Sequence, residues 1–286
     1  MTVLMSGAPV AEMVFADLGP RVHELRAAGH EPGLGTILVG DDPASAGYIR
    51  MKQARAAALG LTSPHIHLPA DTTQQQLVEA IEGFNDDPAV DAMLVQHPVP
   101  DHLDYEAALA LIDPDKDADG ALPLNMGRLA LGLPGPVSCT PAGIEALLAH
   151  YEVPVAGRDV VIVGRGFTIG RPLALLLTQK RPTANAAVTV VHTGVADWAA
   201  HTRRADIVVA AAGVPGMIRP EHIRPGAVVV GAGVRYEGRR LLPDVDETCE
   251  QVAGWITPRV GGVGPTTVAM LFRNAVEAAE RRAARA

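Results

Sequence analysis

The sequence has few cysteines, few aromatic residues and no clustered basic segment, and each scarcity excludes a class of protein. Its 286 residues include only Cys139 and Cys249, too few for the disulfide framework of a small secreted domain. Lys and Arg number 24 against 32 Asp and Glu, a net charge of −8, with no basic cluster suited to nucleic acid or an anionic membrane. No apolar run approaches the roughly 18 residues of a membrane span, and the first ten residues lack a signal peptide's charged segment. These absences predict a cytoplasmic protein without a nucleic-acid or membrane partner.

What the sequence does contain is an alternation of short apolar runs and longer segments rich in Ala and Leu. Aromatic residues make up 3% of the chain, so we expect a core of aliphatic side chains. Continuously apolar runs are typical of strands covered on both faces, and they predict strands at Gly35–Val39, Ala92–Gln96, Asp159–Val163, Val188–Val191, Ile207–Ala210 and Ala227–Val230. Helices are predicted at Ala11–Ala28, Ala44–Leu59, Gln74–Asn85, Tyr105–Ile112, Pro141–His150, Ile169–Thr178 and Thr266–Arg282. The alternation predicts an α/β protein with mostly parallel sheets.

Two segments rich in glycine and proline divide the chain. The first, residues 132–138, precedes Thr140-Pro141, a pair typical of a helix N-cap followed by proline at the first helical position. The second, residues 257–265, precedes the closing helix. We therefore predict a first domain at residues 1–140, joined by a returning final helix at 266–286, and a second domain at residues 141–265.

The segment Asp159–Pro172 has the order strand, glycine turn, helix. Its glycines Gly164, Gly166 and Gly170 are spaced G-x-G-x-x-x-G, one residue longer than the common dinucleotide fingerprint. Such a turn lets backbone N–H groups approach a pyrophosphate, and a tight turn without a ligand is the alternative. The next strand ends without the acid that binds the ribose 2′-hydroxyl of NAD, while Arg165 can contact a 2′-phosphate. These features favour NADP over NAD.

A second chemical signal is the pair Tyr48 and Lys52, which are four residues apart and share a helical face. A phenol and an amine on one face can hold a ring and supply a proton-transfer group, although such a pair alone is more often a solvated surface pair. Further distinctive segments follow in a fixed order, at residues 95–100, 113–120, 139–143 and 261–265.

Together with the glycine loop, these segments resemble the methylenetetrahydrofolate dehydrogenase/cyclohydrolase family over about residues 32–278. The resemblance implies an amino-terminal α/β domain with the folate site and a Rossmann-type NADP-binding domain, flanking a cleft, with the final helix returning to the first domain. It implies a homodimer formed through the Rossmann domain. It also implies that a tetrahydrofolate derivative is the substrate: methylenetetrahydrofolate is oxidised with NADP, and the methenyl product is hydrolysed to 10-formyltetrahydrofolate, in the one-carbon metabolism that serves purine biosynthesis.

The resemblance further implies a role for each matching residue. Lys52 transfers the proton in hydrolysis, for which desolvation must lower its pKa, and Gln96 positions Lys52. Tyr48 orients the folate and Asp119 hydrogen-bonds the pterin, while Gly261 and Gly262 let backbone approach the folate or nicotinamide. Each has a structural alternative: Gln96 as a strand-end amide, Asp119 as a turn residue, the two glycines as a hinge. The implied cofactor-binding residues are Gly164, Arg165, Gly166, Thr193 and Val234, and no metal ligand is implied.

The sequence departs from the family pattern at a few positions near the expected chemistry. His97 stands where leucine is usual, and its ring can carry charge beside Lys52 or merely fill space. Gly231 replaces an aspartate, and Arg259 and Val260 stand in a segment that usually reads Thr-Pro-Val-Pro-Gly-Gly. Two alternatives therefore stay open: a family paralogue with one activity reduced or a modified folate as substrate, and a non-catalytic folate- or nucleotide-binding protein. Intact Tyr48, Lys52 and Gln96 argue against the second.

Overall fold

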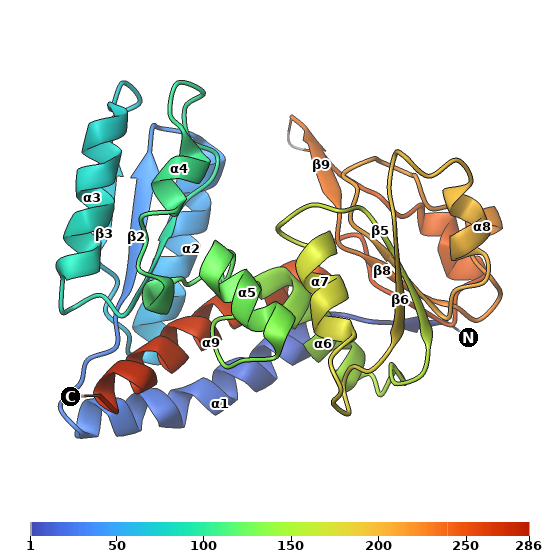
Figure 1. The fold of residues 1–286 in the computed structure, drawn as a ribbon, viewed down its shortest axis with the longest axis horizontal. Coiled ribbons are helices and arrows are strands. Elements are labelled where there is room, and N and C mark those ends of the chain that lie inside the picture. Colours follow the sequence, from blue (N-terminus) through green and yellow to red (C-terminus); the bar gives the residue numbers. More distant parts are fainter. Residues whose placement is uncertain (1, 239, 286) are drawn as a thin grey trace. The chain divides into compact units, whose positions relative to one another are not determined.

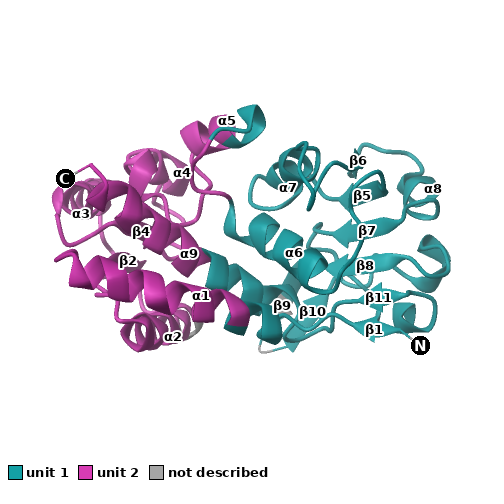
Figure 2. Cartoon of the chain, turned by 90° about the horizontal axis from the view of Figure 1, so that it is seen from below, with its two compact units in different colours: residues 1–12, 129–133, 138–270 teal, residues 13–128, 134–137, 271–286 magenta. Residues whose placement is uncertain are grey.

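The computed structural model describes residues 2–238 and 240–285, which form two compact units (Figure 2). Unit 1 comprises Met1–Glu12, Leu129–Leu133 and Ser138–Met270, and unit 2 comprises Met13–Arg128, Pro134–Val137 and Leu271–Ala286. The chain passes between the units within helices α1 (Ala8–Ala27), α5 (Pro123–Leu131) and α9 (Val263–Ala283), and twice more in the segment between α5 and residue 138. None of the helices in the described ranges is long and apolar enough to span a membrane.

Unit 1 is built on a six-stranded sheet in the order β1-β11-β8-β7-β5-β6, in which all neighbours are parallel (Figure 2). Its strands are β1 (Val3–Leu4), β5 (Asp159–Val163), β6 (Ala187–Val191), β7 (Ile207–Ala210), β8 (Val228–Gly231) and β11 (Trp255–Ile256). Successive residues of β5 enter opposite cores. Val160 and Ile162 pack with helices α6 (Cys139–His150) and α7 (Gly170–Leu177), whereas Val161 and Val163 pack on the other face. Burial on both faces explains the continuously apolar runs.

Shorter elements complete unit 1. Helix α8 (Trp198–Thr202) connects β6 to β7, and the antiparallel hairpin of β9 (Val234–Glu237) and β10 (Arg240–Pro243) follows β8. Two 3₁₀ helices, η2 (Pro220–His222) and η3 (Glu247–Gln251), flank β8 and the hairpin in the chain.

Unit 2 contains a three-stranded parallel sheet in the order β3-β2-β4. The strands are β2 (Leu34–Val39), β3 (His65–Leu68) and β4 (Ala92–Val95), and the helices are α2 (Pro43–Leu59), α3 (Gln74–Asp86), α4 (Tyr105–Leu109) and the 3₁₀ turn η1 (Pro114–Lys116). The core joins Ile37 of β2 and Met93 of β4 to Leu77 and Ile81 of α3. Helix α3 starts with a capping box in which Thr73 and Gln76 bond each other's backbone.

Helices α1 and α9 run side by side in unit 2 (Figure 1), although they lie at opposite ends of the sequence. Arg21 Nε and Nη2 each donate to one carboxylate oxygen of Glu280 at 2.7 Å. The rings of Phe15 and Phe272 meet edge to face, with their centroids 5.8 Å apart. These two contacts hold α9, near the carboxyl end of the chain, against α1, near its amino end.

The predicted α/β class with mostly parallel sheets is confirmed, and every predicted helix or strand end lies within three residues of an observed one. The predicted start of α6 is wrong: Ser138 is the N-cap, and the helix begins at Cys139. Pro141 is then its third residue, still in the first turn, where a missing N–H removes no helical bond. The predicted Thr266 start is wrong in the same way, because α9 begins at Val263.

The compact units divide the chain at other residues than the predicted domain boundaries. Strand β1 pairs with β11, so the first residues join unit 1 rather than the unit that contains β2 to β4. Helix α9 contributes its first residues to unit 1 and the rest to unit 2. Nothing in the local sequence indicates that residues 3–4 pair with a distant strand, or at which residue α9 passes from one unit to the other.

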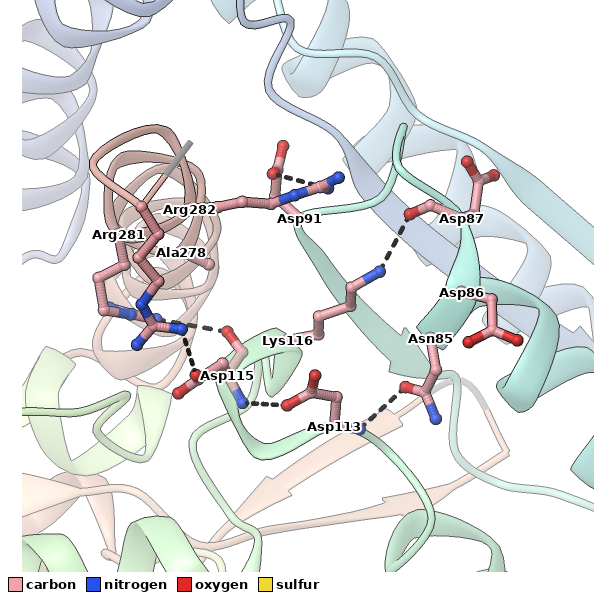
Figure 3. Close-up of a pocket in the computed structure, with 11 residues that line it drawn as sticks. Asn85, Asp86, Asp87, Asp91, Asp113, Asp115, Lys116, Ala278, Arg281 and Arg282 are labelled. Carbon is pink, nitrogen blue, oxygen red and sulfur yellow. Dashed lines mark hydrogen bonds and ion pairs between the residues drawn. The ribbon is translucent and has the colours of Figure 1, made fainter.

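A buried carboxylate, Asp91, fixes the carboxyl end of α9 to the start of the unit 2 sheet. Its side chain is fully buried, accepts a hydrogen bond from Gly33 N at 2.9 Å, and lies 2.9 Å from His30 Nε2. Arg282 Nη1 of α9 lies 3.4 Å from the same carboxylate (Figure 3). We expect Asp91→Asn to lower the free energy of unfolding by about 2 kcal/mol, since it removes the negative charge from these contacts. Urea unfolding measures the change, with the exposed Asp86→Asn as control. Equal stability of the two variants would contradict the role of Asp91.

Candidate active site

Helix α2 carries the first part of the site. Asp42 caps it by accepting a hydrogen bond from Ser45 N at 2.7 Å, and Gly60 ends it in the left-handed conformation, with φ of 83°. Between these caps, Tyr48 and Lys52 stand one turn apart. The Tyr48 side chain is exposed, and Lys52 is half-buried.

Gln96 follows the last residue of β4 and continues the strand pairing by donating its N–H to Ile37 O at 2.8 Å. Its side-chain Nε2 donates to the carbonyl of His97 at 2.8 Å, which orients the amide. Its Oε1 then accepts a hydrogen bond from Lys52 Nζ at 3.0 Å. The amide of Gln96 therefore gives the lysine a neutral acceptor.

Asp119 stands on a tight loop whose shape comes from Asp117. The buried Asp117 carboxylate accepts from Gly120 N and Leu122 N, both at 2.9 Å, and Gly120 has a φ of 64° that favours glycine. Asp119 itself is exposed, but the protein packed around its carboxyl removes part of its hydration and raises its pKa. The positive charge of Lys52 opposes this shift, so the two groups belong to one electrostatic neighbourhood.

Tyr105 is a neighbour of this site that the sequence pattern does not indicate. Its hydroxyl donates to Val95 O at 3.3 Å, and burial, together with the charges of Asp119 and Asp117, raises its pKa. The exposed ring of His97 packs edge to face on Tyr105, with 5.1 Å between centroids. The sequence does not indicate a role for Tyr105, because its hydrogen-bond acceptor, Val95 O, lies on β4 rather than in the helix that carries the tyrosine.

In unit 1, the glycine loop connects β5 to α7. A Cβ on Gly164, which has a φ of 127°, would lie 2.1 Å from Ala211 O, and a Cβ on Gly170 would lie 2.2 Å from Gly164 O. At Gly166, by contrast, the nearest atom to an added Cβ is 3.9 Å away. The first and last glycines are therefore required by close backbone packing. Gly166 and Arg165 lie in the exposed part of the loop.

The loop lies where dinucleotides bind in parallel sheets. The strands that follow β5 in the chain, β6 and β7, pair on its two sides, so the strand order reverses at β5. Thr193 follows β6 and Val234 follows β8, and both are exposed at the same carboxyl edge. No acid occupies residues 192–194 after β6. An uncovered backbone loop, an arginine and the absence of that acid fit an NADP-type dinucleotide.

Asp244 is a second residue whose role the sequence did not indicate. It is buried, and its Oδ2 accepts from Ala212 N at 2.7 Å and Gly213 N at 2.9 Å, which fixes the loop after β7 beside Gly164. Burial raises its pKa, and these backbone donors oppose the shift. A Cβ on Gly233 would collide with that oxygen, so a side chain there would displace the carboxylate. Nothing in the local pattern Pro-Asp-Val marks these long-range contacts.

Gly261 and Gly262 lie in unit 1, in the turn before α9. Gly261 has a φ of 78°, and its carbonyl accepts from Gly7 N at 2.8 Å. Gly262 is buried, and a Cβ there would lie 2.9 Å from Pro258 O. The structure thus groups the predicted residues Tyr48, Lys52, Gln96 and Asp119 in unit 2, and the glycines with Arg165, Thr193 and Val234 in unit 1.

Comparison with known proteins gives matches to both halves of the chain. Residues 5–119 match the catalytic domain of tetrahydrofolate dehydrogenase/cyclohydrolase, and residues 138–283 match its NAD(P)-binding domain. The chain is 67% identical to "Bifunctional protein FolD 1" of Salinispora tropica over 97% of its own length and 90% of the relative's.

Two solved structures share the fold over almost their whole length. The bifunctional FolD dehydrogenase/cyclohydrolase of Campylobacter jejuni superposes with a TM-score of 0.93 at 37% identity, covering 99% of this chain and 100% of that one. The methylenetetrahydrofolate dehydrogenase-cyclohydrolase of Trypanosoma brucei, complexed with NADP and an inhibitor, gives a TM-score of 0.91 at 38% identity, covering 100% and 99%.

Proposed function

The chain belongs to the tetrahydrofolate dehydrogenase/cyclohydrolase family, and on this premise we propose that it catalyses both reactions of that family's name. It oxidises 5,10-methylenetetrahydrofolate to the 5,10-methenyl form with NADP, and it hydrolyses the methenyl form to 10-formyltetrahydrofolate. The observation that carries the proposal is the hydrogen bond from Lys52 Nζ to Gln96 Oε1, because it holds an amine beside an exposed tyrosine and a carboxylate.

Each residue of unit 2 has a task in this scheme. Water attack on the methenyl carbon releases a proton, and Lys52 is the group that accepts it and returns a proton to the ring nitrogen as the ring opens. Gln96 aims Lys52 without adding a negative charge that would favour the ammonium. The exposed ring of Tyr48 lies against the folate, and Asp119 accepts hydrogen bonds from the pterin amino group and ring N–H.

Unit 1 supplies the dinucleotide site. Backbone N–H groups of the loop from Gly164 to Gly170 bind the pyrophosphate, with Gly166 leaving space for close approach. Thr193 and Val234 line the site beside the loop, and Gly261 and Gly262 shape the turn before α9. NADP⁺ held by these residues would supply the hydride acceptor for oxidation of the one-carbon bridge of the folate.

Arg165 accounts for the preference for NADP over NAD, since its guanidinium can pair with the 2′-phosphate. We expect Arg165→Ala to lose about 1.5–3 kcal/mol of that preference, a factor of roughly 10 to 150 in the ratio of kcat/KM values. The matched control is Arg204→Ala, which removes an exposed arginine after α8. Equal kcat/KM of the wild type for NADP⁺ and NAD⁺ would contradict this assignment.

The experiment that tests the proposed function follows both reactions in the purified protein. Absorbance of NADPH reports oxidation of methylenetetrahydrofolate, and loss of the methenyl absorbance reports hydrolysis. Turnover in both assays is expected. Folate binding without NADPH formation would instead indicate a binding protein.

The proposal also covers the oligomeric state of the enzyme, its compartment and its metabolic role. We place the enzyme in the cytoplasm, because Cys139 and Cys249 are buried and form no disulfide, as suits a reducing compartment. We place it in the one-carbon metabolism that serves purine biosynthesis, because its family acts on tetrahydrofolate. We assign it a homodimer through unit 1. In support, β6 forms an edge of the unit 1 sheet among the described residues, and an edge strand presents backbone groups for further pairing.

A further inference from the structure

The peptide that leads into Asp119 is held from two directions. Ala118 is fully buried, and its N–H donates to Met93 O of β4 at 3.2 Å. On the opposite side of the residue, Ala118 O accepts a hydrogen bond from Asn274 Nδ2 at 2.9 Å. The first contact comes from the sheet. The second comes from α9, where Asn274 is 156 residues from Ala118 in the chain.

Asn274 makes this contact from a buried position in the middle of α9. The residue is 2% exposed, and its Nδ2 donates both to Ala118 O and, at 3.0 Å, to Val137 O. Burying an amide is unfavourable unless its polar atoms find partners, and here both N–H groups have one. The side chain thereby joins the loop of Asp119 to the segment 134–137, with α9 as the rigid support.

The geometry of a peptide bond makes this contact relevant to Asp119. Ala118 C=O and Asp119 N–H belong to one rigid plane, so a hydrogen bond that aims the carbonyl also sets the direction in which the Asp119 backbone begins. Asp117 fixes the other end of the loop by accepting from Gly120 N and Leu122 N. Asp119 has little freedom except at its own side chain.

The neighbouring residues show that α9 supports this segment at more than one point. At a polar pocket of about 220 Å³ lined by η1 and α9, Arg281 Nη2 of α9 donates to Asp115 O at 3.5 Å (Figure 3). Arg285, two residues beyond the end of α9, donates through Nη1 to Asp115 Oδ2 at 2.8 Å. Lys116, on η1, donates to Phe84 O and Asp87 O. These contacts anchor η1, directly before the loop, whereas Asn274 reaches the peptide that adjoins Asp119.

We infer that Asn274 is a positioning residue for folate recognition, which it controls by aiming the Asp119 carboxylate through the Ala118 peptide. The inference rests on the proposed function, in which Asp119 accepts hydrogen bonds from the pterin. A misaimed carboxylate weakens binding of the folate in its ground state and in the transition state alike, so the effect belongs in KM rather than in kcat.

The test is Asn274→Leu, which keeps the size of the side chain and removes its two donors. We expect KM for methylenetetrahydrofolate to rise about tenfold, kcat to change less than about threefold, and KM for NADP⁺ to stay unchanged. The matched control is Phe272→Leu, which leaves a cavity in the same helix beside Phe15. It lowers stability without removing a hydrogen bond to the loop, and its folate KM should equal that of the wild type.

Two further measurements keep the outcome decisive. The first is the Kd for tetrahydrofolate, which should rise by a similar factor in Asn274→Leu. Because this measurement needs no turnover, it distinguishes failure of this inference from failure of the proposed activities. If Asn274→Leu does not fold, Asn274→Ala leaves room for a water at Ala118 O and should show a smaller rise in the same direction. An unchanged Kd in the variant that folds, or equal rises in KM for Asn274→Leu and Phe272→Leu, would overturn the inference.

Discussion

Lys52→Met is expected to reduce hydrolysis of methenyltetrahydrofolate by about 10³-fold or more, which leaves no measurable cyclohydrolase activity, because it removes the proton-transfer group. Methionine has nearly the length of the lysine stem and retains the apolar part of its packing. The hydrogen bond from Lys52 Nζ to Gln96 Oε1 is lost, but Gln96 keeps its own bond to His97 O, so the end of β4 should remain in place.

The hydride step provides the internal control for this variant. Hydride transfer moves no proton at the lysine, so formation of NADPH shows that folate and cofactor still bind. Arg50→Met is the matched substitution, since Arg50 is an exposed cation on α2 two residues away and faces another direction. Release of 10-formyltetrahydrofolate at the wild-type rate by Lys52→Met would remove Lys52 from the mechanism.

Asp119→Ala is expected to raise KM for methylenetetrahydrofolate by about 100-fold or more. Each hydrogen bond to a charged acceptor contributes about 1.5–3 kcal/mol, and the carboxylate is assigned two such bonds to the pterin. The loop should survive, because its shape depends on the Asp117 carboxylate and on Gly120 rather than on the side chain of Asp119. Steady-state kinetics measures the effect, with Glu82→Ala on the exposed side of α3 as control. A folate KM within threefold of the wild type would contradict the role of Asp119.

The raised pKa of Asp119 adds a pH dependence with a defined sign. The surrounding protein disfavours the ionised carboxylate, so the folded state binds this proton more tightly than the unfolded state does. Stability from this group is therefore present below the unfolded pKa and is lost as the pH rises through the folded pKa. At neutral pH, Asp119→Asn should unfold at a higher temperature than the wild type although it binds folate less well, and the gain should vanish in acid. Folate affinity has the opposite trend, since it needs the ionised form.

The sequence by itself determined the class of fold and the elements on which the chemistry stands. Apolar runs such as residues 160–163 and 207–210 match the buried parts of β5 and β7, because a strand segment buried on both faces must be apolar at every position. The glycine turn and the helix with Tyr48 and Lys52 could also be predicted, because the residue spacing of each pattern is set within a single turn or a single helix. The sequence predicts the first residue of a helix less accurately. Ser138 and Thr140 are both acceptable N-caps for α6, and only packing selects Ser138.

Only the tertiary structure decided which distant residues support these elements. Strand β1 has two residues, and it becomes a strand because β11 offers a partner edge. Asp244 fixes the loop after β7, Tyr105 bonds Val95 O of β4, and Asn274 holds the Ala118 carbonyl across 156 residues of chain. Hydrogen bonds of this kind depend on where two backbones pass each other in space, and no periodicity or short motif along the chain records that distance.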